Sequence, residues 1–279
     1  MAGYEALRPE ILANEIMTDR ERVSVFRKLC YQGPMLGEIK KMGDVVRIPG
    51  VGRPTVNDYS GAPITWEQKQ ASQQLLYIDQ AKYVAVMIDE VDDKQAQMKV
   101  INKEIQEAKR ALAQTVDEFL AGMYASAGTT ITNSACVSTN ILSTLTEAEK
   151  ALLENDVPAG EDIHLVVSPA VYEKMKLAKI VFQQTNKEAF GKGYMGSYLN
   201  FNVHVSNSVQ ENGDVDYCMA FTNQAIAFAE QIPASNIKIL ELEDYFGQAF
   251  KVLNLYGGKV IRPSELVQIA ITPDEEAAI

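Results

Sequence analysis

The chain has 279 residues, of which 47% are hydrophobic and 23% charged, so it can bury a substantial core in one or two lobes. Its net charge of -11, with only 26 lysines and arginines, argues against a nucleic-acid-binding surface, because phosphate binding draws on concentrated positive charge. Three cysteines without C-x-x-C spacing, and an N-terminus without a signal-peptide pattern, predict a reduced, intracellular, soluble protein. No stretch reaches the apolar length of a bilayer span, so we expect no membrane partner.

Residues 1–40 are predicted to form an N-terminal arm. Pro9 can open a helix at its first turn, and apolar residues then recur at helical spacing from Ile11 to Met17. Because this stretch is otherwise polar, we expect the arm to pack on something outside itself.

Residues 41–88 read as an extended loop. Its first strand is interrupted by Pro49, which has no backbone donor, so it cannot be a central strand of a sheet. A return strand from about Ser72 to Ile88 completes a two-stranded hairpin with its tip near Gly52 to Glu67. Such a hairpin is marginally stable alone, so a neighbour must order it. Trp66, the only tryptophan, either covers its own hairpin or anchors a contact.

One long helix dominates residues 89–140. No Gly or Pro occurs between Asp92 and Ala121, and apolar residues recur there in steps of three and four. This predicted core face comprises Ile101, Ile105, Ala108, Leu112, Val116, Phe119 and Met123. A helix of about 30 residues is about 45 Å long, whereas a compact chain of this size has a radius of gyration of about 19 Å. The helix therefore crosses the whole molecule.

The remaining chain predicts an α+β fold. Gly128 to Asn140 reads as a loop between lobes, and residues 141–235 alternate strands with short helices, including a helix from Pro169 to about Ala178. The predicted strands are Ile163–Val167, Phe201–Val205 and Tyr217–Phe228, followed in residues 236–279 by Ile237–Leu242, Ala249–Leu255, Gly258–Ile261 and an acidic tail. The absence of regular strand–helix–strand repetition argues against a doubly wound sheet.

No set of residues predicts catalysis, a metal site or a bound cofactor. The run GKGYMG, from Gly191 to Gly196, matches a dinucleotide-binding pattern, but no helix follows it, so we interpret it as a glycine-rich loop. His164 and His204 each lie in an apolar, strand-like run and read as packed or surface strand residues. Ser168 is followed by Pro169, which excludes a hydrolase nucleophile elbow.

The order of the segments resembles the major capsid protein of tailed bacteriophages, with the Hong Kong 97 fold, over nearly the whole chain. The likeness lies in GDVVRIPGVGRPTVNDYSGAPITWE, LLYIDQAKYVAVMIDEVD, LVVSPAVYEKM, GYMGSYLNFNVHVSN, AIAFAEQI and LNLYGGKVIRPSELVQI. It implies an N-terminal arm (1–40), an extended loop (41–88), a peripheral domain with a spine helix (89–140), an axial domain (141–235) and returning peripheral strands with a tail (236–279). The family often has Gly in the turn before an axial strand, where this chain has Asn200, a residue that tolerates positive φ.

The resemblance also implies a function. The chain would self-assemble as hexamers and pentamers into an icosahedral shell around double-stranded DNA, with scaffolding, portal and decoration proteins as further partners. It would be assembled in the bacterial cytoplasm and reside in the virion, without enzymatic activity. Candidate inter-subunit contacts near the loop tip are Arg53, Tyr59, Trp66, Glu67 and Lys69. Some relatives join subunits through a Lys–Asn bond; Lys69 lies near the tip, but no partner Asn can be assigned. The alternative is a cellular nanocompartment of the same fold that encloses an enzyme.

Overall fold

The computed structural model describes residues 25–32, 45–50, 72–89, 99–158, 160–180, 194–231, 237–241 and 247–274. The helices are α2 (Phe26–Leu29), α4 (Lys99–Ala121), α5 (Ile141–Glu154) and α6 (Pro169–Leu177), with the 3-10 helices η3 (Gly122–Ser126) and η5 (Pro263–Glu265). The strands are β1 (Val45–Gly50), β2 (Ser72–Tyr77), β3 (Gln80–Asp89), β4 (Thr129–Cys136), β5 (Ile163–Val167), β6 (Tyr194–Tyr198), β7 (Phe201–Val205), β8 (Gln210–Asn212), β9 (Val215–Thr222), β10 (Ile226–Gln231), β11 (Ile237–Glu241), β12 (Gly247–Val260) and β13 (Leu266–Pro273).

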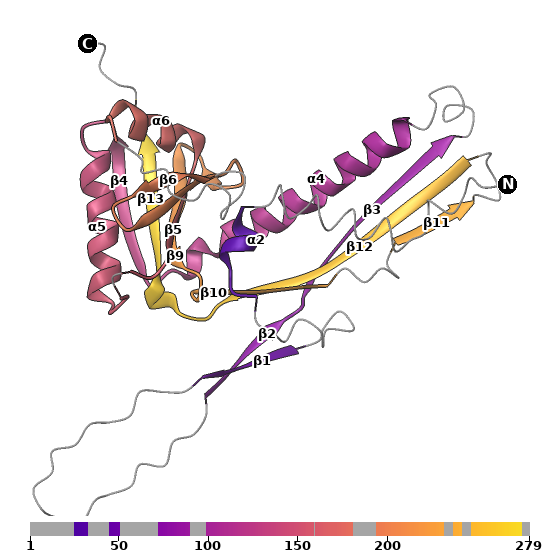
Figure 1. Cartoon of the computed structure of the whole chain (residues 1–279), viewed down its shortest axis with the longest axis horizontal. Helices are drawn as coiled ribbons and strands as arrows, with labels where there is room; N and C mark the ends of the chain where they lie inside the picture. Colours follow the sequence, from indigo (N-terminus) through magenta and orange to yellow (C-terminus); the bar gives the residue numbers. More distant parts are fainter. Residues whose placement is uncertain are drawn as a thin grey trace, which may run out of the picture.

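A seven-stranded mixed sheet forms one end of the molecule (Figure 1). Its strand order is β4-β13-β9-β5-β7-β6, with β8 paired to β9. Helices α5 and α6 pack on one face, where the side chains of Leu145, Leu152, Val171 and Met175 are fully buried. Helix α6 begins where Ser168 Oγ accepts a hydrogen bond from the backbone of Val171 and Pro169 occupies the first turn, which is a favourable helix start.

The other face of the seven-stranded sheet is covered by η3 and α2. On β9, Tyr217 and Phe221 are four residues apart and so point to the same face. Tyr217 stacks on Tyr124 of η3, with ring centroids 4.3 Å apart, and Phe221 stacks on Phe26 of α2 at 6.4 Å. The sheet is therefore enclosed on both faces by elements of its own chain.

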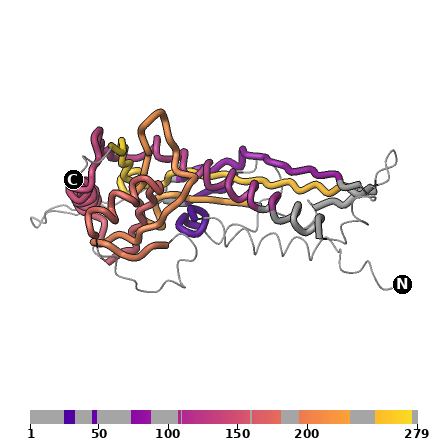
Figure 2. The backbone as a smooth tube through the Cα atoms, turned by 90° about the horizontal axis from the view of Figure 1, so that it is seen from above, coloured from indigo at the N-terminus to yellow at the C-terminus, as the bar shows by residue number. Residues whose placement is uncertain are grey.

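A four-stranded antiparallel sheet and α4 extend from this domain as a long projection (Figure 2). The 14-residue strand β12 pairs with β3 along one edge and with β10 and β11 along the other. Helix α4 lies against one face of the sheet, where the rings of Phe119 and Tyr256 meet edge to face at 5.2 Å. Leu112, Val116 and Leu120 are buried at spacings of four residues, which is one helical stripe.

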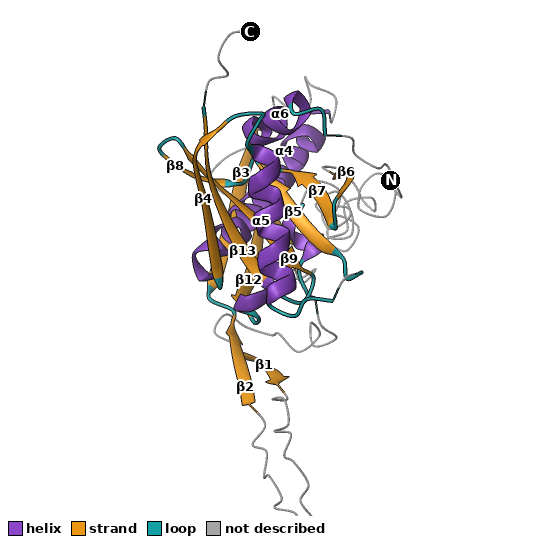
Figure 3. Ribbon diagram, turned by 90° about the vertical axis from the view of Figure 1, so that its left-hand side faces the viewer, coloured by secondary structure: helices purple, strands orange, loops and turns teal. Residues whose placement is uncertain are grey.

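A third, two-stranded sheet forms the base of a hairpin. Strands β1 and β2 pair antiparallel from Val45↔Tyr77 to Gly50↔Ser72, and the hairpin points away from both larger sheets (Figure 3). Within the described residues β1 pairs with β2 alone, as Pro49 in this strand led us to expect.

The predicted N-terminal arm is wrong for the segment Val25–Gln32, which we call the clasp, because this segment packs on the body of its own chain. Phe26 and Leu29 are buried in the chain's own core, and Val25 N donates a hydrogen bond of 2.9 Å to Asp117 of α4. Tyr31 N donates to the carbonyl oxygen of Ile226 at 2.8 Å, which ties the clasp to β10. The apolar spacing of Phe26, Leu29 and Cys30 is a helical stripe that folds inward, so at least 25–32 belong to the subunit body.

Four further predictions differ from the structure. The return strand Ser72–Ile88 divides at Ile78, so β2 stays in the hairpin while β3 joins the four-stranded sheet. The predicted loop Gly128–Asn140 contains β4, whose β-branched residues pair in parallel with β13. Tyr217–Phe228 is divided between β9 and β10, and the predicted strands Ala249–Leu255 and Gly258–Ile261 are one strand, β12.

The domain boundaries shift accordingly. Strand β13 lies inside the segment 236–279 that was expected to return to the peripheral domain, yet it is a central strand of the seven-stranded sheet. Its run LVQIAITP, which was not assigned to any predicted strand, is buried on both faces, as is typical of a central strand. In the turn before β7, the positive φ falls on Leu199 (53°) rather than on Asn200.

Candidate subunit interface

The hairpin base presents apolar side chains to solvent. Val45 and Tyr77 are directly opposite each other across the two strands, and the side chain of Tyr77 is 55% exposed. Directly opposed residues on antiparallel strands share a face. A contiguous exposed apolar area is a candidate for contact with another molecule.

The hairpin is fixed to the body by a small apolar cluster. Leu76 and Ile78 are buried against Ala227 and Ala229 of β10 and Leu255 of β12, and Val46 and Ile48 of β1 pack on this cluster. Lys259 Nζ donates a hydrogen bond of 3.1 Å to the carbonyl oxygen of Leu75. The root of the hairpin is therefore anchored even though its length projects from the molecule.

Gly257 permits the crossing between the hairpin root and β12. A Cβ atom at this position would lie 2.1 Å from the carbonyl oxygen of Tyr77 and 3.0 Å from the Cα atom of Ile78. The clash involves backbone atoms, which cannot move aside as a flexible side chain can. Any larger residue at Gly257 would displace the hairpin root.

The four-stranded sheet has an open face on the side away from α4. Tyr83 and Met87 of β3 are 75% and 56% exposed, and their partners in the β12 register are Leu253 and Ala249, both half-buried. We call the patch of Tyr83, Ala85, Met87, Ala249 and Lys251 the open face, and among the described residues no helix or strand covers it. Leu253, at its edge, packs on the apolar cluster of the hairpin root.

Sequence reasoning did not identify the open face. The run QAKYVAVMID has apolar residues at both parities of the strand, a pattern that indicates a strand with two apolar faces. Val84 and Val86, whose register partners are Val252 and Phe250, face α4. The contact with α4 explains only one of the two apolar faces of the strand. The other parity, from Tyr83 to Met87, was the signal for an exposed apolar surface.

The structure leaves the predicted contact residues untested. Arg53, Tyr59, Trp66, Glu67 and Lys69 lie outside the described residues. On the predicted spine-helix face, the side chains of Ile101 and Ile105 are also outside the description, Leu112 and Val116 are buried, and Phe119 is half-buried against β12.

The two histidines meet in the core of the seven-stranded domain. His164 Nδ1 and His204 Nε2 are 3.2 Å apart and both rings are buried. Burial lowers the pKa of both, and for His204, with His164 beside it, the value falls to about 3. Both imidazoles are therefore neutral near pH 7, and one ring donates a hydrogen bond to the other.

The remaining sequence features have structural roles here. Ser168 caps α6 and its hydroxyl donates to the buried carboxylate of Asp216. The second half of GKGYMG lies in β6, so this motif leads into a strand. In the described part of the chain, no cluster of three or more His, Cys, Asp or Glu side chains could hold a metal ion. No described helix is long and apolar enough to cross a membrane.

Comparisons with known proteins identify the fold. The sequence model of the phage capsid protein family matches residues 77–269. A solved structure from Mycobacterium phage Che8 is 26% identical, with a TM-score of 0.71 over 88% of this chain and 90% of that chain. The capsid structure of cyanophage P-SCSP1u is 17% identical, with a TM-score of 0.63 over 91% and 89% of the two chains.

A virus-like particle from Pyrococcus furiosus is also similar, at 15% identity and a TM-score of 0.59 over 93% of this chain and 98% of that chain. Likenesses at 17% and 15% identity concern the fold alone, and no curated protein matches the sequence. The family match covers more than half of the chain and concerns phage capsid proteins, so the nanocompartment alternative fits less well. The chain belongs to the phage capsid protein family and is a major capsid protein with a Hong Kong 97-type fold.

Proposed function

We propose that this capsid subunit is joined to its neighbours through the hairpin and the open face, in hexamers and pentamers of an icosahedral shell. The observation that carries the proposal is the exposed apolar surface of the open face, next to a hairpin whose base is also apolar and exposed. A shell subunit is surrounded by copies of itself, which can cover both surfaces. The loop-tip residues Arg53, Tyr59, Trp66, Glu67 and Lys69 are proposed to contribute to the same contacts.

The proposed domains follow the sheets. The four-stranded sheet with α4 corresponds to the peripheral domain and its spine helix, and the seven-stranded sheet corresponds to the axial domain. This assignment moves β4 and β13 into the axial domain. The hairpin of β1 and β2 is the root of the extended loop.

The energetics favour many weak contacts. Apolar burial contributes about 25 cal/mol per Å², and a subunit surrounded by neighbours buries several standard interfaces of about 1,600 Å² each. Much of this gain offsets lost rigid-body freedom and the ordering of the hairpin. Individual contacts stay reversible, which permits correction of errors during growth, while their sum stabilises the closed particle.

The proposed cargo is double-stranded DNA held without sequence recognition. A net charge of -11 suits a wall that does not grip a polyanion, because strong attraction would oppose packing and release. We propose further that scaffolding, portal and decoration proteins are partners, that assembly takes place in the host cytoplasm, and that the subunit performs no catalysis.

Deletion of residues 53–67 tests the interface. We expect the variant to remain folded by circular dichroism, because the anchoring residues Leu76 and Ile78 are retained, but to form no stable particles by negative-stain electron microscopy. The control is Gln73→Ala, an exposed substitution on the retained part of the hairpin, which should assemble normally. Normal particles from the deletion variant would refute the role of the hairpin.

A further inference from the structure

A five-residue segment, Ile261–Glu265, connects the two large sheets. It follows β12 of the four-stranded sheet and includes η5, which leads directly into β13 of the seven-stranded sheet. We call it the junction segment. Because only five residues join the two sheets, the conformation of this segment limits how the sheets can be oriented relative to each other.

The junction segment is held firmly on the side of the seven-stranded domain. The backbone N–H groups of Ile261 and Arg262 both donate to the carbonyl oxygen of Ala225, at 2.8 and 3.2 Å. Gly128 N donates to the carbonyl oxygen of Pro263 at 2.8 Å, and Asn155 Nδ2 donates to that of Ser264 at 3.0 Å. A Cβ atom on Gly128 would lie 2.5 Å from the Pro263 oxygen, so only glycine permits this approach.

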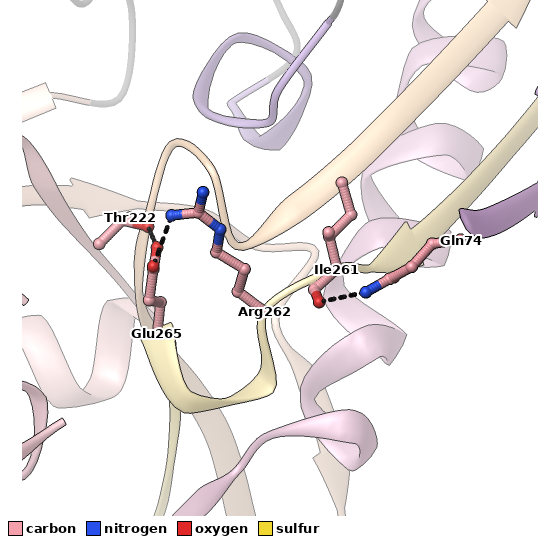
Figure 4. A network of polar contacts seen from close by, with 5 residues as sticks. All are labelled: Gln74, Thr222, Ile261, Arg262 and Glu265. Carbon is pink, nitrogen blue, oxygen red and sulfur yellow. Dashed lines mark hydrogen bonds and ion pairs between the residues drawn. The ribbon is translucent and has the colours of Figure 1, made fainter. Parts of the chain in front are cut away.

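Side chains within the segment reinforce its shape (Figure 4). Glu265 accepts a hydrogen bond from the hydroxyl of Thr222, at the end of β9, through Oε2. Its other oxygen, Oε1, lies 2.7 Å from Arg262 Nη1 in an ion pair. One carboxylate, immediately before β13, therefore connects the end of β9 with the second residue after β12.

The same segment also contacts the hairpin. Gln74 of β2 donates from Nε2 to the carbonyl oxygen of Ile261 at 3.0 Å (Figure 4). The side chain of Ile261 packs on the apolar cluster that holds Leu76 and Ile78. Ile261 thus contacts the hairpin through its side chain and carbonyl oxygen, and the turn from β9 to β10 through its N–H group.

We propose that the junction segment couples the position of the hairpin to the orientation of the seven-stranded domain. A tilt of the hairpin root displaces Ile261 or breaks the Gln74 hydrogen bond, and a displacement of Ile261 is transmitted to Ala225, Thr222 and Gly128. This consequence rests on the proposed function: when a neighbouring subunit contacts the hairpin, the orientation of the seven-stranded domain changes. The coupling itself is a property of the single subunit.

Hydrogen exchange on the unassembled full-length chain tests the coupling. Gln74→Ala removes the donor to Ile261, and Gln73→Ala, an exposed neighbour of the same residue type, is the matched control. A hydrogen bond contributes about 1 kcal/mol net, which corresponds to about a fivefold change in an opening equilibrium. We expect amides in peptides spanning 259–266 to exchange about fivefold faster in Gln74→Ala than in wild type or Gln73→Ala.

The reciprocal variant is Thr222→Val, which breaks the junction on the opposite side. Coupling between two sites acts in both directions, so exchange in peptides covering 72–77 should accelerate although no hairpin contact is altered. Acceleration confined to the hairpin in Gln74→Ala, or to residues 222–226 and 261–266 in Thr222→Val, would overturn the proposal. Neither measurement needs assembled particles. A negative result here therefore refutes the coupling within the subunit, whereas normal particles from the deletion variant refute the role of the hairpin in assembly.

Discussion

The two large sheets of this subunit differ in how their apolar surfaces are covered. The seven-stranded sheet is enclosed by α5 and α6 on one face and by η3 and the clasp on the other. In the four-stranded sheet, α4 covers one face, while Tyr83 and Met87 remain exposed on the other. The chain therefore encloses one sheet with its own elements and leaves apolar side chains exposed on the other, which is the surface that we propose neighbouring subunits cover.

The largest expected effect concerns α4, which both regions share. Leu112→Asp places a carboxylate in the buried apolar stripe of the helix. The surrounding apolar side chains offer it neither a hydrogen bond nor an opposite charge. We expect a loss of about 4 kcal/mol or more in the free energy of unfolding, enough to unfold much of the population. Circular dichroism during urea denaturation measures this loss.

The matched control is Ala111→Asp, one residue away on the exposed side of the same helix. It should cost less than about 1 kcal/mol, mainly through lower helix propensity. If Leu112→Asp melted only the four-stranded region and left the other sheet intact, the two regions would be separate cooperative units.

The second prediction concerns the clasp. Arg27 Nε lies 2.9 Å from Glu230 Oε2 of β10, with side-chain exposures of 10% and 3%, and Asn254 Nδ2 donates to Glu230 Oε1 at 2.9 Å. Arg27→Met leaves the Glu230 carboxylate buried beside Asn254 without its cation. Breaking a buried pair in this way costs about 3 to 5 kcal/mol.

The double variant Arg27→Met with Glu230→Gln removes the orphaned charge and should recover more than half of the loss in urea denaturation. A single-variant loss below about 1 kcal/mol, or no recovery in the double variant, would show that the clasp does not depend on this pair.

The sequence predicted the parts of the fold that local patterns determine. Strands β5 and β7 and helix α6 lie where the apolar runs and the Ser168–Pro169 start indicated. The chain order also identified the family. Helix α5 was not assigned, although Ile141, Leu145, Ala148 and Leu152 recur at helical spacing.

Long-range pairing could not be read from local patterns. Strand β13 is central because β4 and β9, from distant segments, lie on its two sides, and nothing within LVQIAITP specifies those partners. The same limit applies to β2 and β3, which look like one strand until the crossing at Gly257 assigns them to different sheets. The two histidines met because β5 and β7 pair in parallel, a contact between residues 40 positions apart.

The third prediction uses this histidine pair to examine the enclosed domain alone. His164 packs near Phe221 of β9 and His204 near Tyr194 of β6. A hydrogen bond with Asn223 and the charge of Asp162 raise the pKa of His164, but burial lowers it by more. Burial lowers the pKa of both rings in the folded state, to about 3 for His204, whereas an unfolded histidine titrates near 6.5. Below about pH 6.5 the unfolded chain therefore binds more protons than the folded chain.

Stability should consequently fall as the pH decreases from about 6.5 toward 3, by up to about 1.4 kcal/mol per pH unit for His204, and the lowered pKa of His164 acts in the same direction. His204→Gln should be less stable than the wild type at neutral pH. Urea denaturation at several pH values should show that its free energy of unfolding depends less steeply on pH, because about one proton fewer binds on unfolding. An unchanged slope would show that the pair is not a neutral, buried element of this domain.

The smallest expected effect on stability distinguishes the open face. Tyr83→Ser with Met87→Ser removes two exposed side chains, so the free energy of unfolding of the unassembled subunit should change by less than about 1 kcal/mol. If neighbours cover this face in the shell, the same variant loses apolar contact area in every subunit, and light scattering should show slower assembly and a higher critical concentration. Lys82→Ser, an exposed change on the same strand but at the opposite parity, is the control and should assemble as the wild type does.

If the double variant assembled like the wild type, the open face would stay exposed to solvent in the shell. The proposed contrast between a sheet covered by its own chain and a surface covered by neighbours would then depend on the hairpin alone.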